Sequence, residues 1–439
     1  MMFFGRKKEI EKLQEIRNLS HKAAQFTVLT GRRRIGKTSL VMKAYEDETI
    51  LYFFVTRSTE SVLCEEFMAE ITEKLQIPLL GKTERFAEIF DYVMEISKTR
   101  PITLMIDEFQ DFNRVNSAIF SQIQKIWDMK KGESKINLIV CGSVYSMMTK
   151  LFRNNKEPLY GRQTEFMKIE SFTPEVLKEI LAYHNPKYNK EDLLALYAFT
   201  GGVAKYVELL MEGEATTMEK MMGRIIAKNS YFIYEGKNML IEEFGRDYGR
   251  YFDILKLIAT GHNTRGDIEG ILHSEVSGYM TRLENDYGLI VKNKPMFQKS
   301  ANKNIVYAIK DLFLLFWFRY IYKYNYFIEA NAYKKLAEIV ERDYETYSGK
   351  ILEKFFIAVM KESEQFTRID SWWDRKGENE IDIIAADDLE NQVTFYEVKR
   401  QRKELDLKVL DDKVKRFKEA TGQYGKYNVS LKGLCMEDM

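Results

Sequence analysis

Residues 31–38 read Gly31-Arg-Arg-Arg-Ile-Gly-Lys-Thr38, and this stretch decides how the first part of the chain is interpreted. Its spacing matches G-x-x-x-x-G-K-[ST], a loop whose backbone N–H groups wrap around phosphate oxygens. The preceding residues 26–30 (FTVLT) form a short apolar run, and residues 39–45 (SLVMKAY) begin like a helix. A strand, a glycine loop and a helix N-terminus together make an anion-binding cradle. The stretch therefore predicts a site for the phosphates of ATP or GTP.

Each residue of this loop is a candidate contact for the nucleotide. Lys37 is expected to reach the outer phosphates, and the Thr38 hydroxyl is expected to hold Mg²⁺. The three adjacent arginines raise the local positive field, but their side chains are expected to face solvent or a partner, because backbone groups cradle the phosphates. The predicted nucleotide-binding residues are Gly31, Arg32, Arg33, Arg34, Ile35, Gly36, Lys37, Thr38 and Ser39.

A second motif follows the apolar run 101–106 (PITLMI), which is directly succeeded by Asp107 and Glu108. An acid at the end of such a strand holds Mg²⁺ in nucleotide hydrolases, so Asp107 is the predicted metal ligand and Glu108 the group that polarises the attacking water. An Asp-Glu pair also suits the start of a helix. The glycine loop favours the nucleotide interpretation, since one site then explains both motifs. No N-K-x-D guanine-reading motif is evident, so ATP with Mg²⁺ is the predicted ligand.

Two further residues are candidates for the hydrolytic reaction. Ser143 ends the apolar run 139–143 (IVCGS), where a hydroxyl could contact the attacking water or the γ-phosphate; an ordinary strand-to-helix turn is the alternative. Arg162 follows a polar loop and could stabilise charge on the γ-phosphate, in its own chain or from a neighbouring one. A solvated loop arginine is the alternative there.

Together these motifs resemble a known family. The segments FGR (4–6), TGRRRIGKTS (30–39), LMIDEFQ (104–110), GS (142–143) and LYGR (159–162) are similar to those of prokaryotic, mainly archaeal, P-loop ATPases related to the AAA+ and STAND groups. The resemblance extends over nearly the whole chain and implies an α/β P-loop NTPase domain with a parallel sheet, followed by a helical lid. The family's T-G-G-x-P-x-Y turn corresponds to residues 200–206 (TGGVAKY), where Ala204 replaces the proline.

Composition narrows the class of protein without naming a partner. The 439 residues contain 67 Lys+Arg and 66 Asp+Glu, so a nucleic-acid surface would have to be a local patch. A hydrophobic content of 45% with 30% charged residues indicates globular domains. Cys64, Cys141 and Cys435 form no C-x-x-C pair, which argues against a zinc site or a disulfide framework and fits a reducing cytoplasm. The apolar segment 312–318 is too short to span a bilayer, so no membrane association is expected.

Four domains are expected: a P-loop ATPase domain at 1–170, a helical lid at 171–245, a winged helix-turn-helix at 246–325 and an α/β nuclease-like domain at 326–439. In the third, helices are predicted at 251–259, 264–272 and 276–285, and strands at 289–292 and 304–309. The last helix would present Ser277, Tyr279 and Arg282 to double-stranded DNA. The segment 291–304 carries lysines 292, 294, 299 and 303 and no acid, which suits phosphate contacts. Such a domain can instead pack against the ATPase without touching nucleic acid.

The last region contains a second acidic constellation. Strands are predicted at 381–385 and 393–399, and Glu397 and Lys399 share a face because side chains alternate along a strand. With Asp382 on the neighbouring strand and Glu353 on an upstream helix, the pattern resembles the PD-(D/E)XK, restriction-endonuclease-like fold. That resemblance implies Mg²⁺ ligands at Glu353, Asp382 and Glu397, with Glu397 and Lys399 as catalytic groups. Glu380 is an alternate ligand, and solvated cross-strand pairs are the alternative interpretation.

Together these expectations predict a Mg²⁺-dependent ATPase. Its cycle of ATP binding and hydrolysis would reset the lid relative to the nuclease-like domain and control DNA handling or cleavage. The competing hypothesis is a non-cutting, ATP-dependent switch that acts on a protein partner or on a second copy of the chain.

Overall fold

The computed structural model describes residues 3–77, 81, 83–245, 248–297, 304–375 and 377–439. Contacts divide these residues into two compact units, unit 1 (3–170) and unit 2 (171–439). Within the described ranges, no helix combines the length and the apolar character needed to cross a membrane. The three cysteines are buried free thiols.

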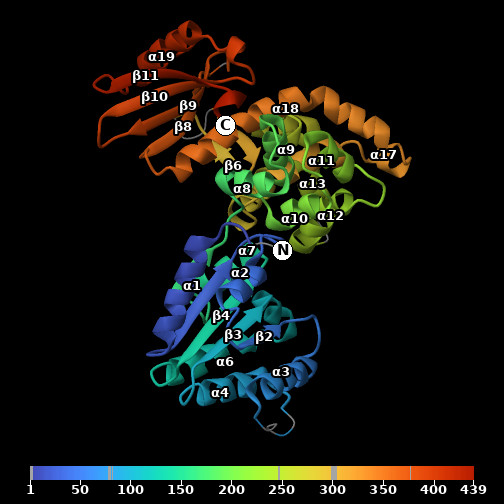
Figure 1. Ribbon diagram of the computed structural model, residues 1–439, viewed down its shortest axis with the longest axis vertical. Coiled ribbons are helices and arrows are strands. Elements are labelled where there is room, and N and C mark those ends of the chain that lie inside the picture. Colours follow the sequence, from blue (N-terminus) through green and yellow to red (C-terminus); the bar gives the residue numbers. More distant parts are fainter. Residues whose placement is uncertain (1–2, 78–80, 82, 246–247, 298–303, 376) are drawn as a thin grey trace. The chain divides into compact units, whose positions relative to one another are not determined.

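Unit 1 is built on a parallel sheet of five strands in the order β2-β3-β4-β1-β5 (Figure 1). The four apolar runs that the sequence singled out form its first four strands. A fifth strand, β5, was not anticipated, because it has only four residues, lies at the sheet edge and is half-buried and charged at both ends. The strands are β1 (Gln25–Thr30), β2 (Ile50–Phe54), β3 (Ile102–Asp107), β4 (Ile136–Gly142) and β5 (Glu165–Lys168).

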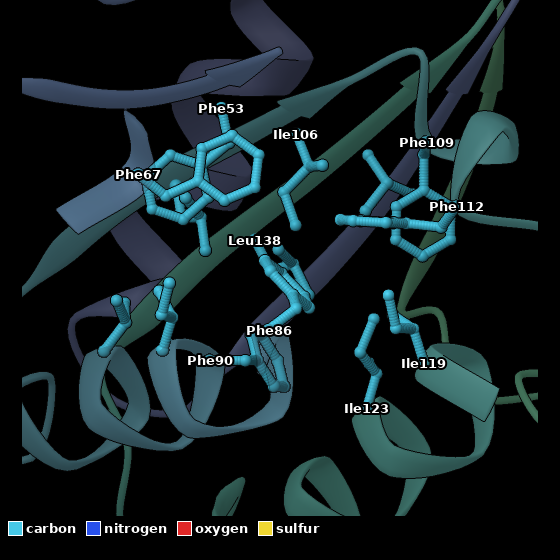
Figure 2. Close-up of a cluster of buried hydrophobic side chains, with 14 of the residues drawn as sticks. Phe53, Phe67, Phe86, Phe90, Ile106, Phe109, Phe112, Ile119, Ile123 and Leu138 are labelled. Carbon is cyan, nitrogen blue, oxygen red and sulfur yellow. The ribbon is translucent and has the colours of Figure 1, made fainter. Parts of the chain in front are cut away.

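Helices cover both faces of this sheet, which explains why β3 is buried along its whole length. The helices α1 (Lys7–Ser20) and α2 (Lys37–Ala44) lie on one face, and α3 (Glu60–Leu75), α4 (Phe86–Ile96) and α6 (Ala118–Lys130) lie on the other. Figure 2 shows the second interface, where Phe53 of β2 stacks on Phe67 of α3 with ring centroids 4.3 Å apart. The shorter helices α5 (Phe112–Val115) and α7 (Tyr145–Arg153) complete the unit.

Unit 2 begins with helices. The first five are α8 (Pro174–His184), α9 (Lys190–Thr200), α10 (Ala204–Glu212), α11 (Met218–Ile225) and α12 (Tyr231–Phe244). The turn between α9 and α10 needs its glycines: Gly202 has a φ of 72°, and a Cβ there would collide with the Phe172 backbone. Ala204 is the first residue of α10, a position where proline is favoured but not required.

Three helices and a β-hairpin follow. They are α13 (Tyr248–Ala259), α14 (Arg265–Leu272), α15 (Ser277–Thr281, extended by a π-helical turn to Asp286), and the antiparallel pair β6 (Ile290–Asn293) and β7 (Val306–Ile309). The aromatic run that follows is α16 (Leu312–Phe316) and a π-helical segment (Trp317–Tyr322), and it is almost entirely buried in unit 2. The short α17 (Asn325–Glu329) precedes the last region.

The C-terminal region has the order helix, three strands, helix, strand. These elements are α18 (Tyr333–Glu362), β8 (Arg368–Trp373), β9 (Glu380–Asp387), β10 (Gln392–Val398), α19 (Leu407–Thr421) and β11 (Asn428–Leu434). The sheet order is β11-β10-β9-β8 (Figure 1). The pairs β8–β9 and β9–β10 are antiparallel, and β11 runs parallel to β10.

The segment after β6 packs into this C-terminal sheet. The Met296 N–H donates to the Ser371 carbonyl at 3.0 Å, and Met296 belongs to the same apolar cluster as Trp372 and Phe417. The Arg368 guanidinium lies over the Phe297 ring. The strand β6 is therefore linked to the C-terminal sheet by contacts of Met296 and Phe297.

Candidate functional site

Parallel strands β3, β4 and β1 are neighbours, so the residues that follow their carboxyl ends meet at one edge of the sheet. The glycine loop follows β1, and α2 begins at Lys37. Arg34 and Gly36 have φ values of 69° and 90°, which curl the backbone between strand and helix. A Cβ on Gly31 would lie 2.7 Å from the Ile169 carbonyl oxygen, so this position requires glycine.

The loop lysine is buried within its own loop. Lys37 is 7% exposed, and its Nζ donates to the carbonyls of Gly31 at 2.9 Å and Arg32 at 3.2 Å. Burial lowers the pKa of Lys37, an effect opposed by the charges of nearby acids. Of the other loop residues, Ile35 is buried, Arg34 and Ser39 are exposed, and Arg32 and Arg33 are half-buried. The loop side chains thus differ in exposure, and Lys37 and Ile35 are the buried ones among residues 32–39.

The two predicted magnesium-site residues lie together. Thr38 Oγ1 donates to Asp107 Oδ2 at 2.6 Å, although 69 residues separate them. Tyr52 of β2 donates to the same oxygen at 3.2 Å, and the Glu108 N–H donates to Asp107 Oδ1 at 2.9 Å. Burial and the Asp107 charge raise the pKa of Tyr52 above its ordinary value. A hydroxyl and a carboxylate are hard oxygen donors, so this pair fits Mg²⁺.

The predicted water-activating residues also meet here. Ser143 Oγ donates to Glu108 Oε2 at 2.7 Å. Glu108 has a φ of 51°, a left-handed conformation that is uncommon for a residue other than glycine. Such backbone conformations cluster at functional sites. The structure thus brings Thr38, Asp107, Glu108 and Ser143 together beside the glycine loop.

Arg162 lies elsewhere in unit 1. It precedes β5, whose parallel orientation places this residue at the opposite edge of the sheet from the glycine loop. Its guanidinium binds Asp128 of α6 at 3.2 Å and the Tyr160 carbonyl at 2.8 Å. The expectation that Arg162 assists within its own chain is therefore corrected: the chain direction of β5 carries it away from the phosphates.

The second acidic constellation also converges. The Val398 N–H donates to Asp382 Oδ2 at 2.7 Å, and Lys399 Nζ lies 3.2 Å from Glu397 Oε1. Burial, followed by the charges of Asp382 and Glu380, raises the pKa of Glu353 to about 8. Burial is also the first cause that raises the pKa of Asp382 to about 6, and the Glu397 charge adds to it. The four predicted residues thus share one electrostatic environment.

Lysines occupy part of this environment. Lys413 of α19 binds both oxygens of Glu397, at 3.0 and 3.2 Å. Burial opposes the charge on Lys399, but the hydrogen bond to Glu397 and the charges of Asp382 and Glu353 raise its pKa. Among the described residues, no group of three or more acidic, His or Cys side chains lies at the spacing of a metal site. A divalent ion at Glu397 would have to compete with these lysines.

The residues predicted to face DNA are engaged within unit 2. The Tyr279 ring packs against Tyr251 at 5.1 Å, and Arg282 lies 3.5 Å from the Tyr251 hydroxyl. Lys292 of the hairpin binds Glu284 at 3.1 Å. Lysines 299 and 303 lie outside the described residues.

Three residues that contact the predicted site residues received no role from the sequence: Tyr52, Lys413 and Gln110, whose Nε2 donates to Glu108 Oε2 at 2.6 Å. Gln110 stands in the LMIDEFQ segment, so the motif itself is a signal for it. Tyr52 is one aromatic residue within an ordinary apolar strand, and Lys413 is one of many lysines on a charged helix. No local pattern distinguishes these two, because long-range contacts give them their place.

The parallel sheet, the glycine loop and the Asp107–Glu108 pair define a P-loop ATPase domain. Residues 3–210 match a family described as an ATPase domain predominantly from Archaea. Residues 317–412 match a second family, described as archaeal and bacterial proteins of unknown function. The chain is 30% identical to the uncharacterised protein MJECL04 of Methanocaldococcus jannaschii, over 97% of this chain and 94% of that protein. The chain therefore belongs to the family of that archaeal protein, and its first part is an ATPase domain of the archaeal P-loop class.

A solved structure agrees at the level of the fold, and a second one is similar to a smaller degree. The Walker-type ATPase PABY2304 of Pyrococcus abyssi has a TM-score of 0.54 and 20% identity, over 72% of this chain and 96% of that chain. The Aeropyrum pernix ORC2 protein, solved in ADPNP and ADP complexes, has a TM-score of 0.47 and 13% identity, over 77% of this chain and 95% of that chain.

Proposed function

We propose that the chain hydrolyses ATP with Mg²⁺ at the glycine loop. The observation that carries this proposal is the contact of Thr38 with Asp107 at 2.6 Å, beside a Glu108 carboxylate that Ser143 holds at 2.7 Å. The backbone of the loop and Lys37 bind and orient the phosphates. Thr38 and Asp107 would hold the ion, which supplies charge neutralisation at the γ-phosphate when it is bound. Glu108 polarises the attacking water, and Ser143 fixes the carboxylate.

The test is steady-state ATP hydrolysis by the full chain with Mg²⁺, compared with Lys37→Ala. We expect Lys37→Ala to abolish nucleotide binding and turnover, because it removes the phosphate-facing charge. Lys43→Ala is the matched control, since Lys43 lies on the same helix and pairs with Glu46 in an exposed position. Hydrolysis at the wild-type rate by Lys37→Ala would contradict the assignment.

We further propose that the ATPase cycle controls the C-terminal region, which we interpret as a restriction-endonuclease-like domain that handles or cleaves DNA. Its order of helix, three strands, helix and strand supports this interpretation, as does the convergence of Glu353, Asp382, Glu397 and Lys399. Strongly shifted pKa values cluster at functional sites, and the raised pKa values of Glu353 and Asp382 are of this kind. The lysines at Glu397 are the observation that favours the rival hypothesis, a non-cutting switch that acts on a protein partner.

A Mg²⁺-dependent nuclease assay on double-stranded DNA separates the two hypotheses. We expect Asp382→Ala to remove cleavage, and Asp412→Asn, a change at an exposed position on α19, to leave it intact. Absence of cutting by the wild-type chain in every nucleotide state would favour the switch.

The helices 248–286 and the hairpin support a winged helix-turn-helix interpretation by their order. The contacts of Met296 and Phe297 with the C-terminal domain favour a role in packing over a free DNA-reading wing. Gel-shift titration with and without ATP, on wild type and Arg282→Ala, tests DNA contact by this domain.

The Arg400 guanidinium, one residue beyond Lys399, binds Glu191 of α9 and Ser348 of α18. The predicted lid helices and the C-terminal sheet therefore belong to one compact unit. These contacts oppose the movement between the lid and the nuclease-like domain that the sequence suggested.

A further inference from the structure

The end of β3 holds a buried side chain to which the proposed mechanism assigns no role, Gln110. It lies in the short 3-10 helix Phe109–Asp111 and is 1% exposed. Its Nε2 donates to Glu108 Oε2 at 2.6 Å, and Ser143 Oγ donates to that same oxygen at 2.7 Å. One oxygen of the water-polarising carboxylate is thus held by two donors, one following β3 and one following β4.

The other end of the Gln110 amide is unsatisfied. Its Oε1 atom is buried and has no hydrogen-bond partner among the described residues. A Cβ on Gly142 would lie 2.5 Å from this oxygen, so the glycine leaves the space that the amide fills. Rotating the amide by half a turn would bring Oε1 against the Glu108 carboxylate, where two acceptors would face each other. The contact with Glu108 therefore decides the orientation of the amide.

An orphaned buried acceptor lowers the stability of the fold, and such groups in folded proteins call for an explanation. In Gln110 the amide that leaves Oε1 unsatisfied also places Nε2 against the Glu108 carboxylate. A hydrogen bond to a charged carboxylate is stronger than one between neutral groups. A side chain that served packing alone would need neither the donor nor the acceptor.

We propose that Gln110 is a positioning residue for ATP hydrolysis, which together with Ser143 fixes Glu108 so that its other oxygen can receive a proton from the attacking water. This inference rests on the proposed ATPase function. As the water oxygen bonds to the γ-phosphorus, the bond to the bridging oxygen breaks and its electron pair leaves with ADP. The water proton passes to Glu108 and is released with inorganic phosphate. Because Oε2 is held by two donors, the carboxylate cannot rotate away while the water reacts.

The test replaces Gln110 with methionine, which has a similar length and no strong hydrogen-bonding group. We expect kcat for ATP hydrolysis to fall about tenfold with KM for ATP unchanged, since one hydrogen bond to a charged group is lost near the reacting water. The free energy of unfolding should not fall, because the orphaned acceptor is removed as well. Gln122→Met is the matched control: Gln122 of α6 also has a buried Oε1 without a partner, and its replacement should leave kcat unchanged.

A double-mutant cycle completes the test. In a Glu108→Gln background, Gln110→Met should cause no further loss of kcat, because the two side chains act as one unit. Parallel losses of kcat and stability in Gln110→Met, or an unchanged kcat, would overturn the positioning role while leaving the ATPase assignment intact. A wild-type chain that hydrolyses no ATP, indistinguishable from Lys37→Ala, would overturn both proposals.

Discussion

Replacing Glu353 with glutamine is expected to stabilise the chain at neutral and alkaline pH. Burial, then the charges of Asp382 and Glu380, raise the pKa of Glu353 from 4.5 to about 8. The folded state thus holds this proton more tightly than the unfolded state does. Below pH 4.5 the Glu353 carboxyl is protonated in both states, so it does not affect the free energy of unfolding. Between pH 4.5 and 8 this carboxyl ionises in the unfolded state but stays protonated in the folded state, so the free energy of unfolding falls as the pH rises.

The size of the effect follows from the interval between these pKa values. Each pKa unit corresponds to about 1.4 kcal/mol, so the wild-type chain should lose about 3 kcal/mol relative to Glu353→Gln between roughly pH 5 and pH 7.5. Glutamine does not titrate, and the titration of Asp382 is common to both chains. The difference between the two unfolding free energies therefore isolates Glu353.

Urea unfolding followed by circular dichroism from pH 5 to pH 8 measures this difference. Glu362→Gln, at the exposed end of the same helix, is the matched control for the substitution itself. Adding Mg²⁺ at pH 8 should stabilise the wild-type chain more than Glu353→Gln if the ionised carboxylate helps to bind the ion. A difference that stays flat across the pH range would falsify the assignment of Glu353 to a buried acidic cluster.

Three further changes test the helix packing of unit 2 and the place of Arg162. Gly236→Ala should destabilise the chain by about 2 kcal/mol, because the new methyl group would enter the Trp317 indole ring, and no loss in urea unfolding would contradict that packing. Gly223 also lies on a helix, but a Cβ added there would meet no other atom. Gly223→Ala should therefore stabilise the chain by about 0.5–1 kcal/mol. Arg162→Ala should leave kcat for ATP hydrolysis unchanged, since its partner is Asp128 at the far edge of the sheet. A clear drop in kcat would instead indicate that Arg162 reaches the nucleotide of a neighbouring chain.

The glycine loop could be predicted from the sequence because its residues are neighbours along the chain. The strand, the glycine loop and the helix start are contiguous, so residues 31–38 specify their own backbone shape through glycine and helix-start preferences. Asp107, Glu108 and Ser143 were found for a related reason: each follows a strongly apolar run, and parallel strands bring their carboxyl ends to one edge. The short, charged strand β5 has no such signal, because its place depends on pairing with β1.

The tertiary structure alone decided which side chains contact each other when they are far apart in the sequence. Because β5 runs parallel to β1, Arg162 lies at the opposite end of the strands from the glycine loop. Because α19 packs against β10, Lys413 contacts Glu397. The sequence by itself determined where the glycine loop and the acidic strand ends lie along the chain, since both are periodic or contiguous patterns. Which partners hold Glu108 and Glu397 was decided by the fold, because hydrogen bonds depend on distances that residue spacing along the chain does not specify.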